Sequence, residues 1–173
     1  MSFSSAANYF DDVEVGQEFE SQGRTVTETD IVNFAGLSGD FNPIHIDHEY
    51  AKTTPFRQPI AHGLLVFSIG SGLGVNCPLM RTIAFVQVNE WNFRGPVFIG
   101  DTVRLRSRVL QKSLKGRGRR GEIIWYRGIV NQEGKIVQEG KLITLVECRS
   151  VIRNRDTESD AVMASTAVEV PVS

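Results

Sequence analysis

Residues 62–76 read HGLLVFSIGSGLGVN, and the fold can be inferred outward from this segment. It is apolar nearly all round, so the helix that we expect here must be buried inside the domain. Glycines stand at positions 63, 70, 72 and 74. Each costs about 0.5–1 kcal/mol relative to alanine in a helix interior. A sheet, a ligand or a partner chain is therefore expected to approach the helix backbone closely.

After this helix the hydrophobic period changes to two, which is typical of strands. The alternation is clearest where Val103, Leu105 and Val109 share one face and arginines occupy the other. Strands are expected over residues 83–93, 102–110, 122–131 and 135–147. Gln132–Gly134 is a hairpin turn between the last two strands, and the basic, glycine-rich segment 112–121 is expected to be a loop. The pattern predicts an α+β fold in which an antiparallel sheet wraps one buried helix.

The segment before the buried helix contains a second helix start. A strand is expected over residues 19–26, followed by Thr27 as the N-cap of a helix over 28–36 with an acid at Asp30. Gly36 can end that helix. Residues 37–59 are expected to be a loop with one helical turn after Asp47.

Length and charge limit the function classes. The chain has 173 residues, which fits one domain over residues 9–150, with a flexible arm at 1–8 and a flexible tail at 151–173. A net charge of -1 argues against a general nucleic-acid binder. The first residues do not resemble a secretory leader, and no apolar run is long enough to span a membrane. Only two cysteines occur, so we expect a cytoplasmic protein without disulfides.

The densest polar cluster is SGDFNPIH, residues 38–45. Asp40 and His45 flank a turn stiffened by Pro43, and Asn42 can hold the loop through its side chain. An acid and an imidazole fixed side by side can hold one water and exchange protons near neutral pH. The alternative is that Asp40 and Asn42 only bond the turn while His45 is half buried.

A metal site is a further alternative for this region. Its candidate ligands would be His45, Asp47, His48 and His62. His-x-Asp-His is not a standard ligand spacing, so no metal is expected.

The sequence PIAHG, residues 59–63, precedes the buried helix. Unpaired amides at a helix N-terminus attract negative charge, and the Gly63 amide could stabilise the oxyanion of a thioester. The alternative is that Gly63 only permits tight packing at the helix start.

These segments together resemble one known family. SGDFNPIH (38–45), Ala51, Pro55-Phe56 and PIAHG (59–63) are similar to the signature of the MaoC-like dehydratases, the (R)-specific enoyl-CoA hydratases. TVTETDI (25–31) and FRGPVFIGDTV (93–103) resemble neighbouring parts of the same family. The similarity covers roughly residues 9–148. It implies the hotdog fold, a long helix wrapped by an antiparallel sheet.

The resemblance also implies an activity and a set of residues. The activity is reversible hydration of a trans-2-enoyl thioester to the (R)-3-hydroxyacyl thioester. Asp40 and His45 would activate the water, Asn42 would shape the loop, the Gly63 amide would bind the oxyanion, and Ser71 would lie beside the catalytic histidine. The thioester would be carried by CoA or an acyl carrier protein, with no other cofactor. The acyl-CoA would lie along the interface of a homodimer or higher oligomer.

Two further questions stay open at this level. The basic segment offers Lys115, Arg117, Arg119 and Arg120 to substrate phosphates, although a solvated loop is the simpler interpretation. The chain could instead be a hotdog thioesterase or a non-catalytic partner subunit. The central helix lacks the acid expected of a hotdog thioesterase. The complete dyad argues against a non-catalytic subunit.

Overall fold

The computed structural model describes residues 7–116 and 119–149. Most of the expected N-terminal arm, Arg117 and the expected tail at 151–173 lie outside the described residues. Asn8, expected in the arm, donates its backbone N–H to the Leu79 carbonyl at 2.8 Å. The elements in chain order are a 3-10 turn Phe10–Asp12, β1 Glu18–Glu20, β2 Arg24–Thr25, α1 Glu28–Ser38, α2 Pro43–Ile46, α3 His48–Thr53, α4 Gly63–Leu73, β3 Thr82–Phe93, β4 Thr102–Lys115, β5 Arg120–Val130 and β6 Ile136–Glu147.

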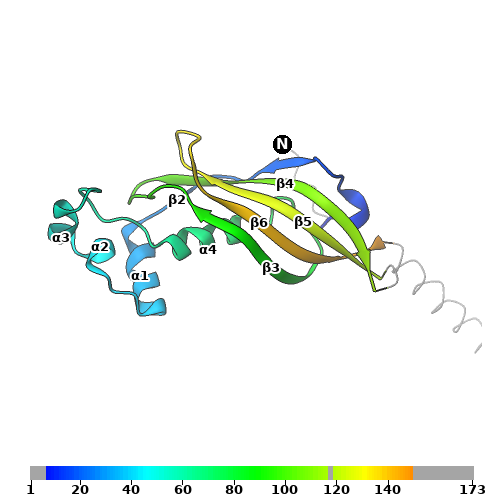
Figure 1. The fold of residues 1–173 in the computed structure, drawn as a ribbon, viewed down its shortest axis with the longest axis horizontal. Helices are drawn as coiled ribbons and strands as arrows, with labels where there is room; N and C mark the ends of the chain where they lie inside the picture. Colours follow the sequence, from blue (N-terminus) through cyan, green and yellow to red (C-terminus); the bar gives the residue numbers. More distant parts are fainter. Residues whose placement is uncertain (1–6, 117–118, 150–173) are drawn as a thin grey trace, which may run out of the picture.

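The strands form one antiparallel sheet. Its order is β1-β4-β5-β6-β3, with β2 paired to β4 beside β1. The long strands curve over α4, while α1, α2 and α3 gather at one end of the molecule (Figure 1). The predicted α+β architecture, a helix covered by an antiparallel sheet, is confirmed.

The alternation predicted for β4 sets which face of the sheet is buried. Val103, Leu105 and Val109 are buried, while the arginines between them are exposed. On the outer face Arg106 binds Glu20 of β1 at 2.8 Å. The strand therefore has the half-buried character that its sequence indicates.

The hairpin between β4 and β5 corrects one prediction. Most of the basic segment expected to be a loop is strand, because Lys112–Lys115 continues β4 and Arg120 begins β5. Lys115 pairs with Arg120 in the register, and Ser113 with Glu122. The ladder hydrogen bonds and the pair between Lys115 and Glu122 at 3.1 Å outweigh the loop tendency of the glycines.

The close approach expected at α4 is observed on its inner face. Leu65, Val66, Ile69 and Gly70 are buried against the sheet. A Cβ at Gly70 would lie 2.4 Å from Cδ1 of Ile129, so the Ile129 side chain would have to shift to admit any larger residue. The helix ends at Leu73, earlier than the predicted end near residue 76.

The outer face of α4 is not covered, contrary to the expectation of a helix buried all round. The exposed residues follow one stripe and are apolar or small: Leu64, Ser68, Ser71, Gly72 and, just beyond the helix, Val75. Nothing lies within 4 Å of a Cβ built at Gly72. The stripe is therefore a surface of this chain, not part of its core.

The helix is too short to cover the whole sheet. Eleven helical residues span about 16 Å, whereas the fourteen residues of β4 span about 46 Å. Beyond α4 the N-terminal segment covers the sheet, where Phe10 and Val13 pack with Trp125 and Val146. Within the described residues, no helix has the length and apolar character needed to cross a bilayer.

The segment before α4 is more ordered than predicted. Thr27 caps α1 and exchanges hydrogen bonds with Asp30, as expected. The helix passes Gly36 and ends at Ser38, where Gly39 has a φ of 77°. The strand expected over 19–26 is split into β1 and β2. Asp47 caps α3 as predicted, and α2 is an additional short helix that begins at Pro43.

Candidate active site

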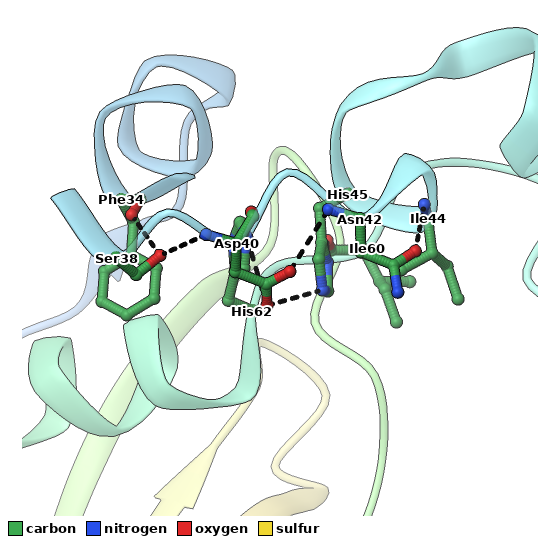
Figure 2. Close-up of polar contacts among 8 residues, drawn as sticks. All are labelled: Phe34, Ser38, Asp40, Asn42, Ile44, His45, Ile60 and His62. Carbon is green, nitrogen blue, oxygen red and sulfur yellow. Dashed lines mark hydrogen bonds and ion pairs between the residues drawn. The ribbon is translucent and has the colours of Figure 1, made fainter. Parts of the chain in front are cut away.

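The loop after α1 fixes the Asp40 side chain through local hydrogen bonds. The Ser38 hydroxyl donates to the Phe34 carbonyl at 2.7 Å and accepts the Asp40 amide at 3.2 Å. Oδ1 of Asp40 accepts the Asn42 amide at 3.2 Å. Oδ1 of Asn42 in turn accepts the Ile44 amide at 3.1 Å, which starts α2. Asn42 therefore holds the loop shape, the role expected from its position (Figure 2).

His45 is presented by α2 with its ring orientation fixed. Its Nδ1 lies 2.8 Å from the Ile60 carbonyl oxygen. A carbonyl only accepts, so we assign the proton to Nδ1, which leaves the Nε2 lone pair free. Nε2 lies 3.9 Å from Oδ2 of Asp40, whose side chain is 53% exposed. The structure therefore brings Asp40 and His45 together, with two acceptors facing each other.

This separation suits a shared water better than a direct bond. At 3.9 Å the two atoms are too far apart for an N–H···O hydrogen bond. One water can donate one hydrogen to Nε2 of His45 and the other to Asp40 at ordinary hydrogen-bond lengths. Such a water is oriented with its oxygen lone pairs pointing away from the dyad. It is then placed to attack an electrophile.

The surroundings of His45 favour its neutral form. Burial lowers the pKa of the His45 imidazole below its usual value, and the nearby His62 acts in the same direction. The hydrogen bond to Ile60 and the charge of Asp40 oppose this shift. Because the net pKa shift is downward, His45 is a free base at neutral pH.

A second histidine completes the cluster and was considered in the sequence only as a metal candidate. The His62 ring stacks on that of His45 with centroids 3.8 Å apart and contacts Phe34 on its other side. Its Nε2 donates to the Asp40 backbone carbonyl at 2.9 Å. His62 therefore contacts both members of the dyad, His45 through ring stacking and Asp40 through its backbone carbonyl (Figure 2). Its position directly before Gly63 was the available signal.

The first residue of α4 is held by the sheet. The Gly63 carbonyl accepts from Nε2 of Gln138 at 2.8 Å, and Trp91 donates to the same glutamine at 3.1 Å. A Cβ at Gly63 would lie 2.8 Å from the Phe93 ring. Packing thus gives one reason for glycine at this position.

The backbone amide of Gly63 could still bind an oxyanion, as predicted. No side chain among the described residues caps the helix start, so the Gly63 amide stays available beside His62. It lies at the positive end of the α4 dipole.

The donor set does not favour a metal ion. Of the alternative ligands, Asp47 caps α3 and His48 bonds Glu28 at 2.7 Å, so neither joins His45. Among the described residues, the cluster whose ligand atoms lie close enough together is Asp40, His45 and His62. Each histidine uses one nitrogen as a donor to a carbonyl, and Nδ1 of His62 is buried without a partner. Two accessible ligand atoms fall short of the three that a catalytic zinc site needs.

Ser71 is not beside the dyad of its own chain. It lies on α4 eight residues after Gly63, about 12 Å further along the helix axis. There it lines a cavity of about 240 Å³ between α4 and the sheet. Aromatic residues Phe67, Trp91 and Trp125 form much of the wall.

The basic hairpin residues are also distant from the dyad in one chain. The β4–β5 hairpin lies at the opposite end of the sheet from α1 and α2 (Figure 1). Lys115 is engaged by Glu122, Arg119 bonds the Gly116 carbonyl, and Arg120 is exposed. Arg117 lies outside the described residues. Their assignment to substrate phosphates stays a prediction.

Comparisons with known proteins agree with this geometry. The family model for the MaoC like domain matches residues 11–123. An (R)-specific enoyl-CoA hydratase from Rhodospirillum rubrum is 37% identical over 143 residues, covering 82% of this chain and 94% of the relative.

Solved structures support both the family and the fold. The unliganded R-hydratase PhaJ1 from Pseudomonas aeruginosa has a TM-score of 0.71 and 30% identity, covering 80% of this chain and 85% of its own. A Mycobacterium tuberculosis protein with a double hotdog fold has a TM-score of 0.72 at 20% identity, covering 82% of this chain and 44% of its own. The last comparison shows the fold alone. The chain therefore has the predicted hotdog fold and belongs to the MaoC-like domain family, and its relatives include hydro-lyases named (R)-specific enoyl-CoA hydratase and 3-hydroxybutyryl-CoA dehydratase.

Proposed function

We propose that the protein catalyses the reversible hydration of a trans-2-enoyl-CoA to the (R)-3-hydroxyacyl-CoA. The observation that carries the proposal is the pair of facing acceptors, Nε2 of His45 and the Asp40 carboxylate, 3.9 Å apart. Relatives named (R)-specific enoyl-CoA hydratase support the reaction class and its stereochemistry. No redox or metal chemistry is required for adding water to a double bond conjugated with a thioester.

In the proposed reaction the dyad orients and deprotonates one water. Its oxygen forms a bond to C3 as the dyad accepts a proton, and electrons of the double bond move towards the thioester oxygen. The Gly63 amide stabilises that developing oxyanion. The dyad returns a proton to C2, which completes the product and regenerates the free dyad, and the dyad acts as one coupled titrating pair.

We further infer that the active unit is a homodimer. One edge of the sheet is β3, a twelve-residue strand. It exposes large apolar side chains, namely Ile83, Phe85, Val86, Val88 and Phe93. A long apolar edge is an aggregation hazard unless another strand pairs with it. Pairing of two β3 strands would also place the exposed small-residue stripe of one α4 against the other.

Such a dimer would explain the distance between Ser71 and the dyad. A two-fold axis between antiparallel α4 helices places the C-terminal half of one helix beside the N-terminal half of the other. Ser71 and the cavity of one subunit would then lie next to Asp40 and His45 of its partner. The acyl chain would enter the cavity of one subunit while its thioester reacts at the dyad of the other.

The test is hydration of crotonyl-CoA, followed by the loss of enoyl-thioester absorbance and by chiral analysis of the product. We expect (R)-3-hydroxybutyryl-CoA. Release of free thiol would indicate a thioesterase instead. Absence of both reactions across short, medium and branched enoyl-CoAs would contradict the proposal and favour a non-catalytic subunit.

The proposed dimer is tested by introducing a charge on the edge strand β3 and measuring the oligomeric state by sedimentation. Val86→Lys places an ammonium group on the exposed edge strand, so we expect a shift from dimer to monomer with loss of hydration. Lys135→Ala, in the turn before β6, is the matched surface control. A wild-type protein that sediments as a fully active monomer would contradict the shared site.

A further inference from the structure

β5 carries one arginine on its inner face. Trp125, Arg127 and Ile129 follow the same period-two alternation, and all three are buried. Arg127 is only 6% exposed. The arginines of β4, in contrast, are exposed to solvent. An arginine is almost never this deeply buried unless a partner pairs with it. Its surroundings therefore need an explanation.

The Arg127 guanidinium lies over the Trp125 ring, 5.0 Å from its centroid, but its hydrogen bonds provide no negative charge. Nη1 donates to the Ser107 hydroxyl at 2.6 Å and to the Cys77 carbonyl at 3.1 Å. Nε is buried and has no partner, and within residues 7–116 and 119–149 no carboxylate forms an ion pair with this side chain. Burial raises the pKa of the Cys77 thiol, so that group is neutral at neutral pH. Burial also lowers the pKa of Arg127 to about 10, which still leaves a cation.

This cation faces the cavity between α4 and the sheet. Arg127 lines the cavity together with Ser71, Gly74 and Thr144. A Cβ at Gly74 would lie 3.0 Å from Nη1 of Arg127, so the glycine leaves room for the guanidinium. The remaining walls are mainly apolar and aromatic. A buried guanidinium in such a setting is suited to bind a carboxylate through paired hydrogen bonds.

We propose that this cavity binds the far end of the acyl chain and that this end carries a carboxylate. The substrate would thus be the CoA thioester of a short unsaturated dicarboxylic acid. This inference rests on the proposed function, because the cavity reaches the chemistry only through the acyl chain. Ser71 and Gly74 are three residues apart on one helix face, about 5–6 Å between side-chain positions. The carboxylate would therefore lie only a few carbons beyond the reacting double bond.

A purely structural role for Arg127 explains less. Its two hydrogen bonds from Nη1 link the Ser107 hydroxyl on β4 to the Cys77 carbonyl in the turn after α4. A glutamine, which is neutral, or a lysine could also make such bonds. They account neither for the unpartnered Nε nor for the missing counter-charge. A carboxylate in the cavity would supply the counter-charge.

The test compares substrates of equal length that differ in one group. These are trans-2-hexenedioyl-CoA, which ends in a carboxylate, and trans-2-hexenoyl-CoA, which ends in a methyl group. For the wild-type protein we expect kcat/KM to be higher for the diacid by roughly a hundredfold, because a site built for a polar group rejects the analogue lacking it. Arg127→Gln should abolish this preference by lowering kcat/KM for the diacid far more than for the monoacid. Arg104→Gln, on the exposed face of β4, should change neither.

Binding gives a second readout that does not depend on turnover. Adipoyl-CoA and hexanoyl-CoA are the saturated counterparts, and calorimetry should show tighter binding of adipoyl-CoA to wild type but not to Arg127→Gln. Equal affinities, or a preference for the monoacid by the wild-type protein, would overturn the proposal even if Arg127→Gln failed to fold. Hydration of the monoacid alone would overturn this inference and leave the proposed function intact. Diacid binding without hydration of either substrate would overturn the proposed function instead.

Discussion

The two ends of α4 present different kinds of chemistry. At its N-terminus, polar groups from residues 38–62 bond one another, and Asp40 is half exposed. Along its C-terminal half, a cavity is enclosed by side chains from α4 and from strands far apart in sequence. The first end is a compact local motif, while the second depends on strand register and packing. Local contacts therefore place the groups of the candidate dyad, whereas the cavity depends on the assembled sheet.

The largest expected effect comes from substitutions in the dyad, at the N-terminal end of α4. Asp40→Asn and His45→Gln should each lower kcat/KM roughly 10³-fold, because each removes a proton acceptor from the dyad. The half-exposed position of Asp40 should leave the fold and Tm nearly unchanged. Asp47→Asn, which alters only the cap of α3, is the matched control. Near-normal hydration by Asp40→Asn would contradict the assignment.

The second prediction concerns the contact that holds α4 against the sheet. Gly70→Ala should lower the free energy of unfolding by about 1–3 kcal/mol, because its Cβ would overlap Ile129. Denaturant unfolding at fixed protein concentration measures the change. Gly36→Ala, which has open space around its Cβ in α1, is the control and should be neutral or stabilising. Equal stability of the two variants would show that the inner face of α4 is not tightly packed.

A smaller effect concerns pH. Because burial lowers the pKa of His45, the wild-type protein should lose activity only as pH falls below the ordinary histidine value of about 6.5. His62 contributes to that lowering. Removing it with His62→Gln should raise the His45 pKa, move the acid limb of kcat/KM to higher pH and reduce kcat about tenfold. His48→Gln, on the exposed side of α3, should leave the profile in place. An unshifted acid limb in His62→Gln would restrict His62 to packing.

The smallest expected effect concerns the basic hairpin. Neutralising Arg119 and Arg120 together, each to Gln, should raise KM about two- to threefold at low salt and spare kcat, if the exposed charges attract substrate phosphates. High salt should cancel the difference. An unchanged KM at low salt would show that the hairpin is only a solvated strand connection.

Much of the fold was predictable because local signals agreed with the final packing. The Thr27 cap, the alternation of β4 and the apolar run of α4 each specified an element directly. The errors arose where packing outweighed local propensity. Gly36 does not end α1 because Gly39 supplies the left-handed residue, and the glycine-rich basic segment is drawn into the sheet by ladder hydrogen bonds.

The site divides in the same way. Asp40, Asn42 and His45 were found because they lie in one short motif whose bonds are local. The support given by His62 and the burial of Arg127 depend on contacts between distant segments. Arg127 had one usable signal in the sequence, since it shares the inward parity of Trp125 and Ile129 on β5. Nothing local indicated that it would lack a counter-charge.

The most direct measurement is complementation between two inactive variants. Asp40→Asn removes the dyad but keeps the cavity, whereas Ser71→Trp blocks the cavity but keeps the dyad. If the dyad of one subunit works with the cavity of its partner, subunit exchange between the two should restore about a quarter of wild-type hydration, since half of the randomly formed dimers are mixed and each has one intact site. No recovery, with mixed dimers demonstrated by mass spectrometry, would contradict the shared active site.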